Sequence, residues 1–228
     1  WRVAFFNAFA RGKGVATDQL LELGSRLRQA KAPLTMQDTS LIRAVLASEG
    51  RYREVRQVWL ASGQQTLLGD GEFEAKSGEL ALGAAPYEWM AGRLTGVRVE
   101  TAKAQVNRKG QALAITSQGL AEGLALSQTV VLSPGRYKLS FLVYGENMAV
   151  THPLAVNVGC RIDTDRSIGV PEPVSLGWGK AAPGEWQVVA GGIVVPADCP
   201  AQTIMFSIAQ TGGRPYSLWI DAVSVQPE

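Results

Sequence analysis

The chain has 228 residues, 46% of them hydrophobic, and a formal net charge of +2. We expect a soluble globular protein with a real hydrophobic core. The small charge, with no cluster of Lys and Arg between aromatics, excludes a nucleic-acid-binding surface, and no apolar stretch reaches the roughly 18–20 residues that a membrane span needs.

The charge is unevenly distributed along the chain. Residues 1–66 carry ten Lys/Arg and five Asp/Glu, whereas the remainder carries twelve and fifteen. Such an asymmetry favours two segments of different character. We predict a helical segment over residues 1–63 and a β-rich domain over residues 64–228.

The first segment has the spacing of short antiparallel helices. Leu20, Leu23 and Leu27 recur at helical intervals, and Pro33 separates this pattern from the next. Residues 41–55 resemble a tetratricopeptide-type helical hairpin, whose turn commonly reads Gly-x-Tyr. A generic helical hairpin is the alternative. Both interpretations make this segment a spacer or docking surface rather than a chemical site.

After Gly63 the pattern changes to short strands separated by turn signals such as Pro134-Gly135 and Gly212-Gly213. Six or more short strands without helical patterns between them predict an antiparallel sandwich. The clearest strands are expected at residues 126–132, 137–144, 155–162, 186–195, 203–210 and 217–225.

The two cysteines indicate in which cellular compartment the protein is found. Cys160 ends one expected strand, and Cys199 lies in a turn flanked by prolines. A disulfide between them would indicate an oxidising compartment, so we expect a bacterial periplasmic, cell-surface or secreted location. Two buried free thiols are the alternative.

Five motifs of the β-rich domain follow one another in a recognisable order. They are residues 68–74 (LGDGEFE), 110–115 (GQALAI), 132–141 (LSPGRYKLSF), Trp186, and residues 218–225 (LWIDAVSV). In this order they resemble the strands and turns of carbohydrate-binding modules of families four and nine. The resemblance implies a galactose-binding-like fold: mainly β, an antiparallel jelly-roll β-sandwich, here with a small N-terminal α-helical segment. The same sandwich also serves as a structural or protein-binding module.

The resemblance implies a structural Ca²⁺ held by Glu74 and Asp221, with the backbone carbonyls of Glu72 and Gln111. Calcium takes six to eight oxygen ligands, and carboxylates on paired terminal strands would join the ends of the domain. This chain departs from the pattern, because residues 107–109 read NRK where some members have another acid. The alternative is that Glu74 and Asp221 hydrogen-bond to the backbone or to an arginine.

Sugar recognition requires aromatic surfaces and a few polar groups that pair with hydroxyls. Alternation along residues 137–144 and 155–162 predicts a polar sheet face carrying Tyr144, Asn157 and Arg161.

Three further aromatics are candidate stacking platforms: Tyr87, Trp89 and Trp178. The alternative for them is packing in the core or within a loop, because large aromatics are mostly buried. Ala121 and Met205 stand where some members of the family carry sugar-contacting aromatics or His. A different ligand, or none, therefore stays open.

The sequence contains no convincing catalytic constellation. The single histidine, His152, precedes a proline in a turn, as solvated loop residues often do. Asp163 and Asp165 are better explained by turn capping, because no strand-helix alternation supplies a nucleotide site. We expect a protein that is not an enzyme.

We therefore predict a non-catalytic carbohydrate-binding module that recognises a cell-envelope or extracellular polysaccharide or oligosaccharide. It would be part of a larger envelope protein, with the helical segment contacting a protein partner. The alternative is a structural or protein-interaction jelly roll in an envelope or polysaccharide-export assembly, with no sugar site.

Overall fold

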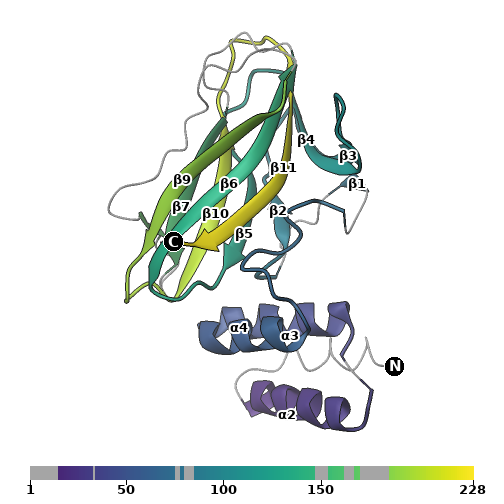
Figure 1. Cartoon of the computed structure of the whole chain (residues 1–228), viewed down its shortest axis with the longest axis vertical. Coiled ribbons are helices and arrows are strands. Elements are labelled where there is room, and N and C mark those ends of the chain that lie inside the picture. The colour runs from purple at the N-terminus through teal and green to yellow at the C-terminus, as the bar shows by residue number, and fades with distance from the viewer. Residues whose placement is uncertain are drawn as a thin grey trace. The chain divides into compact units, whose positions relative to one another are not determined.

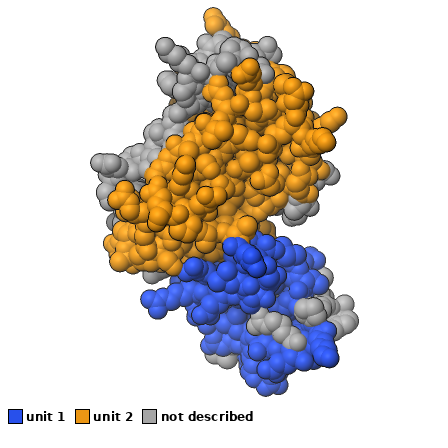
Figure 2. All heavy atoms as spheres, in the orientation of Figure 1, with its two compact units in different colours: residues 1–65 blue, residues 66–228 orange. Residues whose placement is uncertain are grey.

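The computed structural model, drawn in Figure 1, describes residues 15–32, 34–74, 78–79, 85–146, 154–161, 167–169 and 185–228. The chain forms two compact units, residues 1–65 and residues 66–228, which Figure 2 shows in separate colours. The two units divide between Gln65 and Thr66, whereas the boundary predicted from the sequence follows residue 63.

The described helices of the first unit are α2 (Val15–Gln29), α3 (Met36–Ser48) and α4 (Tyr52–Ala61). A capping box starts α3: the Thr35 hydroxyl accepts from Asp38 N, and the Asp38 carboxylate accepts from Thr35 N. None of the described helices is both long enough and apolar enough to cross a membrane.

A tight turn joins α3 to α4 into a helical hairpin. Gly50 has a φ of +71°, a conformation that glycine adopts at little cost, and Tyr52 then begins α4. Leu46, Val55 and Trp59 are buried along the two helices. The turn therefore has the local chemistry that the Gly-x-Tyr pattern predicts, while the tetratricopeptide assignment stays a prediction.

The second unit is a sandwich of two antiparallel sheets, which form its two layers in Figure 1. A six-stranded sheet has the order β1-β3-β4-β11-β6-β9, and a five-stranded sheet has the order β2-β5-β10-β7-β8. The predicted fold class, a mainly β antiparallel sandwich with a small helical segment, is confirmed. The strands are β1 (Gly78–Glu79), β2 (Trp89–Ala91), β3 (Val97–Lys103), β4 (Gln111–Ser117), β5 (Gly123–Val130), β6 (Gly135–Glu146), β7 (Leu154–Arg161), β8 (Ser167–Gly169), β9 (Gln187–Val195), β10 (Ala201–Ile208) and β11 (Tyr216–Pro227).

The core lies between the inward faces of the two sheets. Phe141 of β6 meets Phe206 of β10 edge-to-face, with ring centroids 5.3 Å apart. Along β10, Ile204, Phe206 and Ile208 are buried, whereas the residues between them are half-buried. This alternation fixes which side chains of each strand point away from the core.

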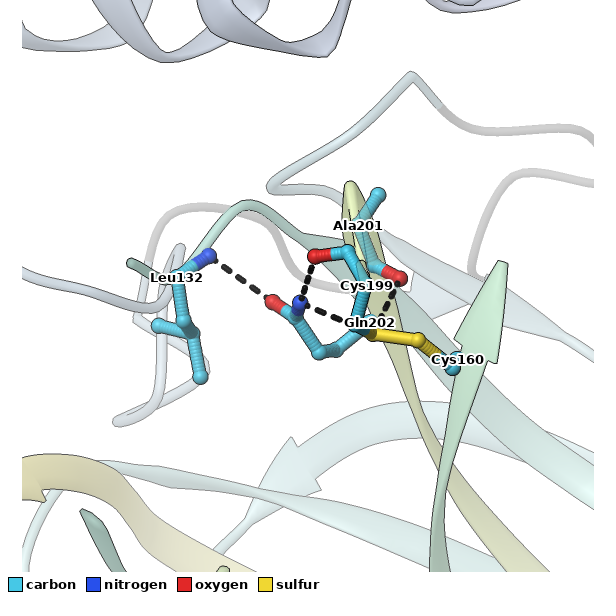
Figure 3. Close-up of a disulfide and its surroundings, with 5 residues drawn as sticks. All are labelled: Leu132, Cys160, Cys199, Ala201 and Gln202. Atoms are coloured by element: carbon cyan, nitrogen blue, oxygen red, sulfur yellow. Dashed lines mark hydrogen bonds between the residues drawn. A yellow bond between two sulfur atoms is a disulfide. The ribbon is translucent and has the colours of Figure 1, made fainter. Parts of the chain in front are cut away.

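A disulfide joins Cys160, near the end of β7, to Cys199, in the turn before β10 (Figure 3). The buried amide of Gln202 supports that turn: its nitrogen donates to the Cys199 carbonyl, and its oxygen accepts from Leu132 N at 2.8 Å. The predicted bridge is therefore confirmed, and the alternative of two free thiols is wrong.

Candidate functional site

The outward face of the five-stranded sheet brings together two of the predicted sugar-binding residues. Asn157 and Arg161 on β7 are half-buried, while Val156 and Val158 beside Asn157 are buried in the core. Residues of β5, β10 and β2 continue this side of the sheet in register, and of these Ser127 is buried. We define the polar face as Met90, Ser127, Thr129, Asn157, Arg161, Thr203 and Met205.

One row of the polar face runs across four strands. Met90 pairs with Ser127, Ser127 with Met205, and Met205 with Asn157. Side chains directly opposite one another on neighbouring strands lie about 4.5–5.5 Å apart at their Cβ atoms. The row therefore places an amide and a hydroxyl among two thioethers, which are flexible apolar groups.

The next row contains hydroxyl groups. Thr129 pairs with Thr203, and Thr203 pairs with the buried Gly159. The two threonine hydroxyls are 3.5 Å apart. Nη1 of Arg161 donates to the Thr129 hydroxyl at 3.4 Å. Guanidinium, amide and hydroxyl groups thus share one side of the sheet and match the hydrogen-bonding needs of vicinal hydroxyls.

Tyr144 does not belong to this face, so the prediction that it accompanies Asn157 and Arg161 is wrong. It lies on β6, in the other sheet, and only 5% of it is exposed. Its ring packs against Trp219 at 5.4 Å and against Trp186 at 5.7 Å, between centroids. Strand alternation shows which residues share one side of a strand, but not which sheet that strand joins.

Burial also governs the ionisation of Tyr144. Removal from water raises the pKa of its hydroxyl, and the hydrogen bond that it donates to Glu146 raises the pKa further. The side chain is therefore neutral and packed, as expected of a structural residue.

Tyr87 and Trp89 are core residues rather than stacking platforms, with 3% and 5% of their surfaces exposed. The Trp89 ring packs against Phe73 and Phe206, and its Nε1 donates to the Asp70 carbonyl at 3.0 Å. These two platform predictions are wrong because the rings fill the interior of the sandwich. The third candidate, Trp178, lies outside the described residues.

Of the four residues predicted to hold calcium, Asp221 and Glu72 contact Arg108, and Glu74 contacts Gln111. Nε of Arg108 pairs with Oδ2 of the buried Asp221, and its Nη2 lies 3.4 Å from Oε2 of Glu72. Oδ1 of Asp221 accepts from Ala222 N at 2.7 Å. Oε1 of Glu74 accepts from Gln111 N at 2.8 Å.

As they stand, these residues do not fit a calcium site. Calcium requires six to eight oxygen ligands, whereas both oxygens of Asp221 and one of Glu74 already accept hydrogen bonds. Glu72 approaches Arg108 through its carboxylate, and Gln111 is seen as a backbone donor. Within the described part of the chain, no group of three His, Cys, Asp or Glu is arranged for a metal ion. The arrangement is that of the alternative, hydrogen bonds to backbone and arginine.

Comparison with known proteins gives a likeness in fold. No family model matches the sequence, and no curated protein matches it. A solved CBM4 structure, of a carbohydrate-binding module, superposes with a TM-score of 0.50 at 18% identity, over 71% of this chain and 99% of that chain. This likeness supports the jelly-roll assignment of the sandwich.

Two further solved structures resemble the chain with lower scores. One is a putative sugar binding protein from Bacteroides thetaiotaomicron, at 13% identity and a TM-score of 0.49, covering 72% of this chain and 100% of that chain. The other is the CBM22-1 xylan-binding domain of Paenibacillus barcinonensis Xyn10C, at 16% identity and a TM-score of 0.47, covering 70% and 96%.

Proposed function

We propose that the sandwich is a non-catalytic carbohydrate-binding module, of the type found in families four and nine, that recognises a cell-envelope or extracellular polysaccharide. The observation that carries this proposal is the polar face, where a guanidinium, an amide and hydroxyls lie in register across the five-stranded sheet. The fold it shares with a carbohydrate-binding module supports the proposal.

The chemistry of the polar face suits a chain of sugars lying across the strands. Asn157 offers a donor and an acceptor, Arg161 offers several donors, and each threonine offers both functions. A single hydrogen bond contributes only about 0.5–1.5 kcal/mol net, so binding would rely on several contacts along one polysaccharide. Met90 and Met205 would pack against the apolar faces of the sugar rings.

The composition of the polar face also supports a role without catalysis. Glycoside hydrolysis generally uses two carboxyl groups placed on either side of the scissile bond. No member of the polar face is Asp or Glu. We therefore assign recognition rather than cleavage to this surface.

The Cys160–Cys199 disulfide supports an oxidising location, because such bridges persist mainly outside the cytosol. A periplasmic, cell-surface or secreted module within a larger envelope protein would meet polysaccharides there. In that arrangement the helical unit would serve as the contact to a protein partner.

The second candidate function is a structural or protein-interaction jelly roll without a sugar site. It is favoured because, among the described residues, the polar face has no aromatic side chain, and Tyr87, Trp89 and Tyr144 are all buried elsewhere. Without aromatic stacking, affinity for a neutral polysaccharide would depend on hydrogen bonds and on the contacts of Met90 and Met205.

A thermal-shift screen of the full chain distinguishes the two functions. Bacterial and plant polysaccharides are added one at a time, because a ligand that binds only the native state raises Tm. A concentration-dependent rise with one polysaccharide class supports the module. No rise with any of them, together with stoichiometric binding of a purified envelope protein, would favour the interaction domain.

A further inference from the structure

Three segments that are distant in sequence meet where the sandwich begins and ends. The opening turn contributes Glu72 and Glu74, the loop between β3 and β4 contributes Arg108, and β11 contributes Asp221. We infer that the Arg108 guanidinium is the structural cation where these three segments meet. It takes the place of the calcium ion that the resemblance to carbohydrate-binding modules implies. The stability of the sandwich then does not depend on calcium.

The backbones at this junction are too close for added side chains. Gly71 accepts from Val223 N at 2.9 Å, and a Cβ on Gly71 would lie 1.9 Å from the Val223 carbonyl oxygen. A Cβ on Gly110 would lie 2.0 Å from Oε1 of Glu74. The glycines therefore permit the close approach of the opening turn to β11 and to the loop between β3 and β4.

The buried carboxylate of Asp221 requires a positively charged partner. Asp221 is only 2% exposed, and an ionised carboxylate removed from water is costly unless it is paired and hydrogen-bonded. Arg108 forms an ion pair with Asp221 and a second one with Glu72. Arginine suits this role because its guanidinium stays charged and presents several donors in a rigid plane.

The loop between β3 and β4 holds Arg108 in position. Ala104 N donates to the Gly110 carbonyl, and the intervening Val106 and Asn107 have φ of +41° and +58°, as in tight hairpin turns. The Arg108 guanidinium lies over the Trp186 ring, with its Cζ 5.7 Å from the centroid.

The aromatic contact is itself anchored. Nε1 of Trp186 donates to the Gln105 carbonyl, in the same loop, at 2.7 Å. The Arg108 guanidinium is therefore held in position by the chain itself, without a bound metal ion. Because it is covalently part of the chain, its contribution to stability does not depend on the Ca²⁺ concentration, unlike that of a bound calcium ion.

The test compares Tm of the full chain in EDTA and in millimolar Ca²⁺ for the wild type, Arg108→Ala and Arg98→Ala. Arg98 is the matched control, because it pairs with Glu100 at 2.8 Å but its side chain is 63% exposed. We expect the same wild-type Tm in both solutions. Arg108→Ala should lower Tm by roughly 5–15 °C, and Arg98→Ala by less than about 2 °C.

A second variant separates charge pairing from simple loss of packing. Adding Asp221→Asn to Arg108→Ala removes the unpaired buried charge, so the double variant should melt higher than Arg108→Ala alone. A wild-type Tm that falls in EDTA and returns with Ca²⁺ would overturn the inference. So would an Arg108→Ala variant as stable as Arg98→Ala, or a double variant that melts lower than Arg108→Ala.

Discussion

The guanidinium of Arg161 on β7 reaches the hydroxyl of Thr129 on β5, although β10 lies between these two strands. The side chain thus extends across the surface of the sheet rather than away from it. Thr203 of β10 lies in the same row and approaches the Thr129 hydroxyl. One cation and two hydroxyls are therefore held together at the end of the polar face where β5 and β7 end and β10 begins.

Thr129→Val should weaken polysaccharide binding roughly 30-fold while leaving the fold intact. The variant removes a potential hydroxyl contact to the sugar and the group that positions Arg161, worth about 1 kcal/mol each. Binding is measured by affinity electrophoresis in gels that contain the polysaccharide. Thr116→Val, an exposed position on β4, is the matched control and should behave as wild type. Equal retardation of the two variants would argue against a role for Thr129.

Loss of the disulfide should destabilise the sandwich without unfolding it at room temperature. Cys160 and Cys199 are 39 residues apart, and closing a loop of that length contributes about 4 kcal/mol in the chain-entropy model. The double variant Cys160→Ser/Cys199→Ser should therefore show a lower urea midpoint, measured by tryptophan fluorescence. Wild-type protein in dithiothreitol should match it. Native cysteines that alkylate readily without reductant would contradict the bridge.

Trp89→Ala should cost about 3–5 kcal/mol of unfolding free energy, because it leaves a cavity between Phe73 and Phe206. Urea unfolding measures this loss. Leu120→Ala, at a side chain that is 71% exposed, should change the free energy by less than about 0.5 kcal/mol. The milder Trp89→Phe variant should bind polysaccharide as the wild type does. Weaker binding at unchanged stability would instead make Trp89 a ligand contact.

Local patterns in the sequence predict the longer strands of the sandwich. Alternation and turn signals place β6, β7 and β10 to within a few residues, because one face of each strand is buried and the other is not. The same signals miss β3, whose sequence VRVETAK is mostly polar. They also miss β2, which is only three residues long.

Long-range pairing explains why the site is harder to predict. Tyr144 and Asn157 both point away from the core, yet their strands belong to different sheets, which no alternation pattern encodes. The burial of Trp89 depends on Phe206, far along the chain. Arg108 is recognisable in the sequence as a departure from a pattern of acids, but its partner Asp221 lies 113 residues away.

Polysaccharide recognition through the polar face is tested by isothermal titration calorimetry, using the polysaccharide that gives the largest rise in Tm. Wild type is compared with Asn157→Ala and Arg161→Ala, and with Lys138→Ala, an exposed residue on β6 in the other sheet. We predict at least about tenfold weaker binding for both polar-face variants, equivalent to about 1.4 kcal/mol, and unchanged binding for Lys138→Ala. Wild-type affinity in all three variants would contradict recognition through the polar face.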